Sequence, residues 1–131
     1  YKALFGEDYY IEIQDHNIDD QKRILPLLVS LARKKGVKIV ATNDVHYLNK
    51  EDSLMQKVLQ CISFRRTLDL ETELKEQQQE VGDTVNEDGY FPTREFYLKS
   101  GDEMRDVFPT LPEALKNTLE IADKCEGYFF R

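Results

Sequence analysis

Residues 37–48 read VKIVATNDVHYL, and this stretch decides how the rest of the chain is interpreted. Its first part, residues 37–43, is apolar and β-branched, which is typical of a buried strand. Its second part carries Asp44 and His46, a carboxylate and an imidazole two positions apart. In an extended chain, residues i and i+2 project from the same face, so the two side chains are expected to lie together.

A second strand and a helix precede this stretch. Residues 9–14, YYIEIQ, alternate in polarity with a period of two, which indicates a strand. Apolar residues then recur at helical spacing up to the basic run 33–35 and Gly36, which together form a helix stop signal. Pro26 lies inside this pattern, where it is expected to kink the helix or to begin a second one. Strand, helix and strand joined by short loops predict a βαβ unit with parallel strands.

Helices are predicted to dominate the remainder of the chain. Residues 51–62 place apolar side chains on one face, with Asn49 as a cap. Two capping boxes, beginning at Ser100 and Thr110, predict two more helices separated by Pro109. The expected fold class is therefore α/β, with a βαβ unit followed by a mostly helical segment.

The charge of the chain is concentrated in one stretch. The 131 residues carry a formal net charge of −7, and residues 69–88 hold eight acids against one lysine, so this stretch alone carries −7. We expect part of residues 69–90 to be a solvated helix and part to be a loop. Binding to nucleic-acid phosphates needs clustered lysine and arginine, so direct contact of this segment with DNA is not expected.

Other features of the sequence restrict its setting. The chain begins with Tyr1, and we expect it to be a piece of a longer protein. No apolar run approaches the ~18 residues needed to cross a bilayer, so a cytoplasmic protein with no membrane partner is expected. Cys61 and Cys125 are too far apart for a zinc knuckle and are predicted to be buried thiols.

The residues alone leave the role of Asp44 and His46 open. A carboxylate and a neutral imidazole suit Zn²⁺, Mn²⁺ or Fe, but a catalytic metal usually takes three or more protein ligands. His16 follows the first predicted strand and is a possible additional site residue. The alternatives are that Asp44 caps the following loop and that His46 is a surface histidine or a hydrogen-bonded core histidine.

Four segments carry a resemblance to a known family. They are YYIEIQDHNI (9–18), VKIVATNDVHYLNKED (37–52), REFYLKSGDEMRDVF (94–108) and PEALKNTLEIADKC (112–125). In this order they resemble the PHP (polymerase and histidinol phosphatase) domain of bacterial DNA polymerase III alpha subunits, which are C-family replicative polymerases, and the segment that follows that domain. The similarity runs from about residue 8 to 127 and is interrupted by the acidic stretch. The resemblance therefore implies that residues 69–90 are an acidic insertion or loop.

The resemblance implies a fold and a site. Residues 1–68 would be the C-terminal part of a PHP domain, a distorted β/α barrel, and residues 91–131 a helical segment leading toward the polymerase region. Asp44 and His46 would be the last metal motif, Asp-x-His, of a phosphoesterase or exonuclease-like site. The other ligands of that family are absent from this sequence, so no catalytic set is complete and the isolated fragment is expected to be inactive.

The resemblance also implies cofactors and partners for the parent protein. The parent would be a DNA-directed DNA polymerase, a nucleotidyltransferase acting on DNA and dNTPs, with Mg²⁺ at a polymerase site outside this chain. The PHP site would hold a divalent metal, namely Zn, Mn or Fe, and other replisome subunits would be partners. The alternative is a non-catalytic scaffold that docks a proofreading subunit or another replisome subunit, with Asp44 and His46 as remnants.

Overall fold

The computed structural model describes residues 1–69 and 91–127, which fall into two compact units. The described parts of the first unit are residues 1–15, 20–42 and 99–127, and those of the second are 16–19, 43–69 and 91–98. Both helices and parallel strands are present, so the protein is of mixed α/β type. Residues 70–90, where the acidic insertion is predicted, lie outside the described residues.

The first unit is built on two parallel strands. Strand β1 (Tyr10–Ile13) pairs with β2 (Lys38–Ala41), with Tyr10 opposite Lys38, and helix α2 (Asp19–Lys35) connects them in the chain. The predicted βαβ unit is therefore confirmed. Two short elements precede it, helix α1 (Lys2–Phe5) and the 3-10 turn η1 (Gly6–Asp8). That this unit is part of a distorted β/α barrel, as the family resemblance implies, stays a prediction.

Helix α2 is continuous through Pro26, so of the two expected alternatives, a kink or the start of a second helix, the second is wrong. Pro26 has no N–H group, so it cannot donate the usual helical hydrogen bond to the residue four positions earlier. The helix persists because Val29 and Ala32, on the turns that follow, are buried in the core. Gly36 then adopts φ 59, the left-handed conformation that ends many helices, as predicted.

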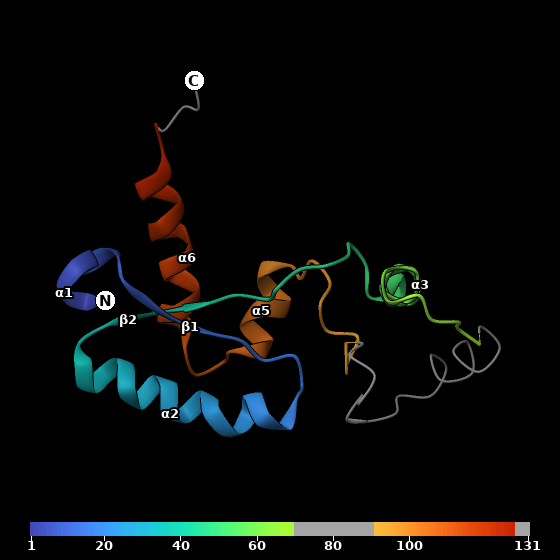
Figure 1. The fold of residues 1–131 in the computed structure, drawn as a ribbon. Helices are drawn as coiled ribbons and strands as arrows, with labels where there is room; N and C mark the ends of the chain where they lie inside the picture. Colours follow the sequence, from blue (N-terminus) through green and yellow to red (C-terminus); the bar gives the residue numbers. More distant parts are fainter. Residues whose placement is uncertain (70–90, 128–131) are drawn as a thin grey trace. The chain divides into compact units, whose positions relative to one another are not determined.

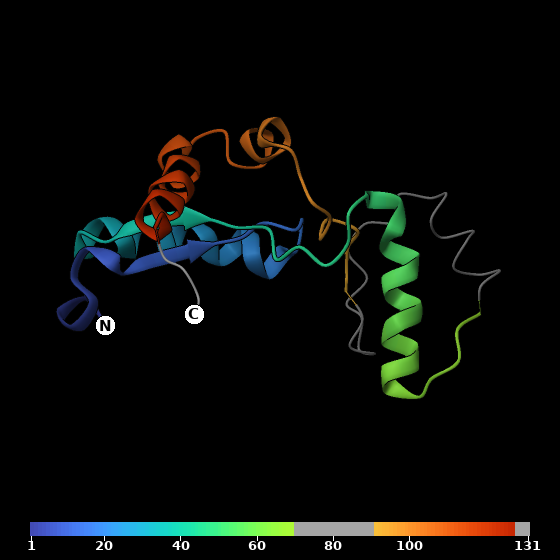
Figure 2. The same ribbon diagram turned by 90° about the horizontal axis from the view of Figure 1, so that it is seen from above.

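Helices α5 (Gly101–Val107) and α6 (Pro112–Cys125) complete the first unit. Helices α2 and α6 lie on opposite sides of the strand pair, as Figures 1 and 2 show. The buried core joins side chains of both strands to these helices and to the loop between α5 and α6. Its members are Ile13, Val29, Ala32, Ile39, Ala41, Phe108, Leu111 and Ala114.

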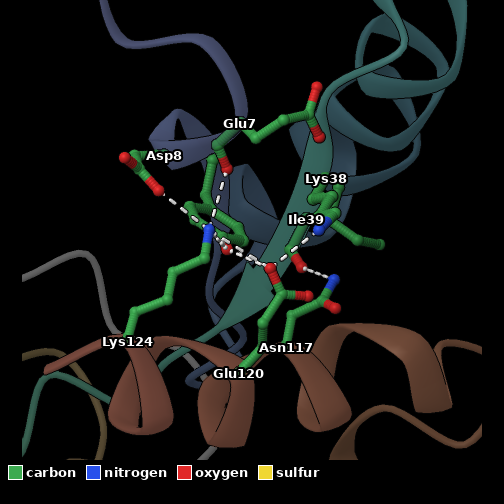
Figure 3. A network of polar contacts seen from close by, with 8 residues as sticks. Glu7, Asp8, Lys38, Ile39, Asn117, Glu120 and Lys124 are labelled. Atoms are coloured by element: carbon green, nitrogen blue, oxygen red, sulfur yellow. Dashed lines mark hydrogen bonds and ion pairs between the residues drawn. The ribbon is translucent and has the colours of Figure 1, made fainter. Parts of the chain in front are cut away.

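A polar network fastens α6 to the strands (Figure 3). One carboxylate oxygen of Glu120, Oε1, accepts hydrogen bonds from Tyr10 Oη and Lys38 Nζ, each at 2.7 Å. Lys124 Nζ donates to Asp8 Oδ1 at 2.8 Å and to Tyr10 Oη at 2.9 Å. The hydrogen bonds from Lys38 and then Tyr10 hold the pKa of Glu120 down at about 2. Two acids and two lysines balance, so the network carries no net charge.

Asn117 of α6 protects the outer edge of β2. The N–H of Thr42 donates to the Ile13 carbonyl, so the backbone of Thr42 faces β1. Successive residues of a strand direct their backbone groups to opposite sides, and Ile39 is three positions away from Thr42. Its carbonyl therefore points away from β1. Asn117 Nδ2 donates to that carbonyl at 2.8 Å (Figure 3). A helix side chain thus satisfies a backbone group that an unpaired strand edge would otherwise expose.

The two predicted capping boxes have different outcomes. Before α5, Ser100 Oγ accepts from the Glu103 N–H at 3.3 Å, and the Glu103 carboxylate accepts from the Ser100 N–H at 2.7 Å, which confirms the first box. The second is wrong, because α6 begins at Pro112 with Leu111 as its N-cap rather than Thr110. Pro112 suits the first helical position, where an N–H would have no helical partner, and Leu111 is held by burial.

The second unit contains the 3-10 turn η2 (Lys50–Asp52) and helix α3 (Ser53–Phe64). Asn49 precedes η2, and its N–H donates to the Asp52 carboxylate at 2.9 Å, so the predicted helix start is correct within a few residues. The chain at Tyr47 pairs in parallel with the chain at Tyr97 through an isolated bridge. In this unit a short extended segment therefore lies beside the residues that follow β2 in the sequence.

Two expectations about the setting of the chain are also tested. Cys61 is buried as predicted, but Cys125, at the end of α6, is exposed, so the prediction of two buried thiols is wrong for that residue. It fails because the last turn of α6 extends past the core. Among the described residues, no helix combines the length and the apolar character that a membrane span requires.

Candidate metal site

Asp44 and His46 face each other in the second unit. Asp44 Oδ1 lies 3.3 Å from His46 Nε2, and the side chains are 51% and 36% exposed, so both are open to solvent. The predicted reason for this proximity is wrong. Strand β2 ends at Ala41 rather than at residue 43, and Asp44 has φ 41, so the chain is not extended at this point. A left-handed turn at Asp44 brings the pair together instead.

The spacing of the pair suits a shared metal ion. Two protein ligands about 2.1 Å from one tetrahedral ion lie about 3.4 Å apart, and octahedral neighbours about 3.0 Å apart. The observed 3.3 Å falls between these values. An imidazole nitrogen and a carboxylate oxygen are also the donors that Zn²⁺, Mn²⁺ and Fe accept. The residues present therefore fit part of a metal site.

Asn43 anchors the turn from the preceding position. Its side chain is almost fully buried, and Nδ2 donates to the carbonyls of Glu95 at 3.0 Å and Tyr97 at 2.7 Å. On the other side of the turn, the N–H of His46 donates to the Phe96 carbonyl at 2.8 Å. The backbone that flanks Asp44 is thus held against residues 95–97 on both sides.

His16 lies close to this turn, but its Nε2 binds the backbone and is not in the role of a metal ligand. Its side chain is completely buried, and Nε2 lies 3.0 Å from the carbonyl oxygen of Asn43. A carbonyl only accepts, so Nε2 carries the proton and donates. In this structure that nitrogen serves the backbone next to Asp44.

Aromatic rings connect the two histidines. The His16 ring stacks on Phe96 with centroids 3.9 Å apart and an interplanar angle of 10°. Phe96 contacts Phe91 at 4.4 Å, and His46 lies 4.5 Å from Phe91 and 6.2 Å from Phe96. The imidazole of His46 therefore rests against a packed aromatic group on one side.

Among the residues that the structure describes, the pair is not part of a larger donor cluster. Within residues 1–69 and 91–127, no three His, Cys, Asp or Glu side chains gather closely enough to hold one ion. Sequence reasoning identified Asp44, His46 and His16 but missed Asn43, Phe91 and Phe96. The only signal for these three was their polarity or aromatic character, because their partners lie about fifty positions away in the chain.

Fold and site together define an α/β protein in which polar residues follow the carboxyl end of a parallel strand in the chain. Ligand-binding residues of parallel α/β proteins commonly occupy this place. No protein-family model matches the chain. Individual known proteins do match it over nearly its whole length.

The chain is similar to DNA polymerase III subunit alpha of several bacteria. It is 43% identical over 126 residues to that of Treponema pallidum, 39% over 128 residues to that of Borreliella burgdorferi, and 38% over 127 residues to that of Thermus aquaticus. These matches cover 95%, 98% and 95% of this chain. The resemblance to the alpha subunits is thereby confirmed: the chain is homologous to a segment of DNA polymerase III subunit alpha.

The matched region is a small part of each relative. The chain spans 10% of the Treponema and Borreliella proteins and 9% of the Thermus protein. The residues described in this structure therefore do not account for the activity, substrates and partners of a whole alpha subunit.

Proposed function

We propose that this chain is a segment of a replicative DNA polymerase III alpha subunit and that Asp44 and His46 hold a divalent metal ion in its PHP domain. The observation that carries the proposal is the 3.3 Å separation of Asp44 Oδ1 and His46 Nε2, both exposed to solvent. Homology to alpha subunits along 95% of the chain supports the parent protein. The remaining ligands would come from parts of the parent outside this chain.

Each residue of the pair has a defined task in this proposal. The Asp44 carboxylate contributes a negative charge to the ion, and His46 contributes a neutral imidazole through Nε2, which requires its proton to be on Nδ1. A bound divalent ion supplies Lewis acidity and a water of lowered pKa, which is the chemistry of phosphoester hydrolysis. The rings of Phe91 and Phe96 lie against the His46 ring and hold it in place.

The polymerase activity of the parent belongs elsewhere. DNA, dNTPs and Mg²⁺ would bind to other regions of the alpha subunit, since this segment has a net charge of −7 and phosphate binding requires an excess of basic side chains. The proposed contribution of this segment is the metal pair, which by itself supplies two donors. We therefore propose that the isolated segment has no activity of its own.

A scaffold function is the second candidate, and one observation favours it. Helix α3 exposes a row of apolar side chains at helical spacing, with Met55 65%, Leu59 59% and Ile62 69% exposed. An apolar helix face of this kind is a common contact surface for another protein or domain. In this alternative, residues of α3 contact another replisome subunit or another part of the parent, and Asp44 and His46 bind no metal.

Metal analysis of the full-length alpha subunit separates the two candidates. We would compare the wild type with Asp44→Asn and His46→Ala, and use Glu51→Gln, on the exposed turn η2, as a control that removes a nearby carboxylate charge. The proposal predicts bound Zn, Mn or Fe and metal-dependent 3′–5′ exonuclease activity in the wild type and the control, with both lost in the two site variants. Retention of metal and activity in both site variants would refute the proposed metal site. A wild type that contains no metal would leave the scaffold function as the remaining candidate.

A further inference from the structure

The left-handed turn at Asp44 needs an external support. Asp44 has φ 41, a conformation that costs a residue with a side chain on the order of 1 kcal/mol and persists where the surrounding structure enforces it. The orientation of its carboxylate depends on this turn, because β2 has already ended at Ala41. The groups that bind the adjacent backbone therefore decide where the carboxylate points.

His16 binds that backbone directly. Its Nε2–H donates to the Asn43 carbonyl, which belongs to the peptide unit joining Asn43 to Asp44. Rotation of this peptide plane changes the φ angle of Asp44, so a hydrogen bond to its oxygen opposes relaxation of the turn. The bond is shielded from water, because the His16 side chain is completely buried.

His16 is itself held firmly enough to serve as an anchor. Its ring stacks on Phe96, and its carbonyl accepts a hydrogen bond from Thr93 Oγ1 at 2.6 Å. Phe96 also supports the His46 ring and accepts the His46 N–H through its carbonyl. The stacked side chains of His16 and Phe96 therefore form one buried group that supports both Asp44 and His46.

We propose that His16 is a positioning residue that sets the turn at Asp44 by donating to the Asn43 carbonyl, and is not itself a metal ligand. The inference rests on the proposed metal-binding function of Asp44 and His46. Its essential property is the N–H group at the position of Nε2, so a side chain that keeps this donor is expected to keep the site.

Two substitutions in the full-length alpha subunit separate the donor from the ring. His16→Gln keeps an N–H donor at about the reach of Nε2 and loses the stacked ring, whereas His16→Phe keeps a flat ring against Phe96 and loses the donor. Thr93→Val removes the hydrogen bond to the His16 carbonyl with little change in volume, and it loosens the anchor without altering the buried histidine.

The first readout is metal affinity, measured by competition with a chelator using Mn²⁺ or Zn²⁺ alone. Loss of a group that orients a ligand typically weakens metal binding about 10–100-fold, which is the effect expected for His16→Phe. His16→Gln should remain within a few-fold of the wild type, and Thr93→Val should weaken binding modestly. In an Asp44→Asn background, His16→Phe should add nothing further, because its effect acts through Asp44.

The second readout does not depend on metal. In hydrogen–deuterium exchange of the metal-free proteins, a peptide that covers residues 43–48 should exchange faster in His16→Phe than in the wild type or in His16→Gln. A peptide from α3, residues 53–64, is the internal control for local rather than global loosening. This readout tests the positioning role of His16 even if the wild type binds no metal. Absence of metal from the wild type would overturn only the proposed function.

Several results would overturn the inference. Equal and severe loss of metal in His16→Gln and His16→Phe, matching Asp44→Asn, would make His16 a direct ligand. Weaker metal binding in His16→Gln but not in His16→Phe would show that His16 acts through the packing of its ring. Unchanged metal affinity and unchanged exchange in His16→Phe would remove any role for His16 in the turn. If His16→Phe does not fold, Thr93→Val decides, since wild-type exchange of residues 43–48 in that variant would contradict the proposed anchor.

Discussion

The hydroxyl of Tyr10 donates a hydrogen bond of 2.7 Å to Glu120, although 110 positions separate the two residues in the sequence. The same carboxylate oxygen accepts from Lys38, so one atom of α6 joins both strands. The pKa of Glu120 is lowered to about 2, chiefly by Lys38 and then by Tyr10. Its charged form is therefore stabilised in the folded state, and this contribution to stability is lost as the pH falls from about 4.5 toward 2.

The first prediction concerns Glu120→Gln. At neutral pH the substitution should lower the urea midpoint of unfolding, because a neutral amide accepts only weakly from Lys38 and leaves two lysines without their shared acid. The difference from the wild type should shrink steadily below pH 4.5, as the wild-type carboxylate takes up a proton in the unfolded chain first. Urea titrations at several pH values measure this.

The control for this prediction lies on the same helix. Glu113 is an exposed residue of α6 whose contact with Arg33 is 4.0 Å long, so Glu113→Gln removes the same charge without a close partner. Its urea midpoint should stay near that of the wild type at every pH. Equal midpoints for Glu120→Gln and Glu113→Gln at neutral pH would show that the network does not hold α6 in place.

The second prediction uses the two capping boxes. Ser100→Ala should reduce the free energy of unfolding by about 1 kcal/mol, because the hydroxyl caps the first turn of α5. Thr110→Ala should change it by less than about 0.5 kcal/mol, the range of an ordinary surface substitution, since α6 begins at Pro112 with Leu111 rather than Thr110 as its N-cap. Chemical denaturation of both variants measures the contrast. The reverse order of the two effects would contradict the observed helix starts.

The third prediction concerns the phenol of Tyr47. Its hydroxyl is buried and makes no hydrogen bond of normal geometry with the residues that the structure describes. Burial raises the pKa of this phenol, and the nearby backbone of Phe96 opposes that rise by less. Tyr47→Phe should therefore leave stability unchanged or raise it by about 1 kcal/mol, because a desolvated hydroxyl is removed. Tyr10→Phe, which removes a bonded hydroxyl, should instead lower the unfolding midpoint. A destabilising Tyr47→Phe would reveal a partner that supports the hydroxyl.

The local elements of the fold were predictable because their signals are local. Alternating residues 9–14, the basic helix end before Gly36, and the box at Ser100 each act within one turn or one strand, and each formed as expected. The start of α6 was mispredicted because Thr110 and Pro112 offered competing signals. Burial of Leu111, a tertiary effect, selected the proline start.

The proximity of Asp44 and His46 was predictable from the sequence, but its geometry was not, and their role as metal ligands stays a prediction. The sequence marked Asp44 and His46 by their spacing, yet the pair meets through a left-handed turn rather than along a strand. That turn is supported by Asn43 and His16, whose partners are backbone carbonyls. Every residue has a backbone carbonyl, so the sequence does not indicate which carbonyls accept these hydrogen bonds. Only the structure connects these residues to the site.

The most direct test of the account is anomalous diffraction from crystals of the full-length alpha subunit grown with Mn²⁺ or Zn²⁺. We expect one peak that lies about 2.0–2.2 Å from both a carboxylate oxygen of Asp44 and Nε2 of His46, with Nε2 of His16 still bonded to the Asn43 carbonyl. A bound ion that contacts neither Asp44 nor His46, or clear density for both side chains with no ion between them, would contradict the account.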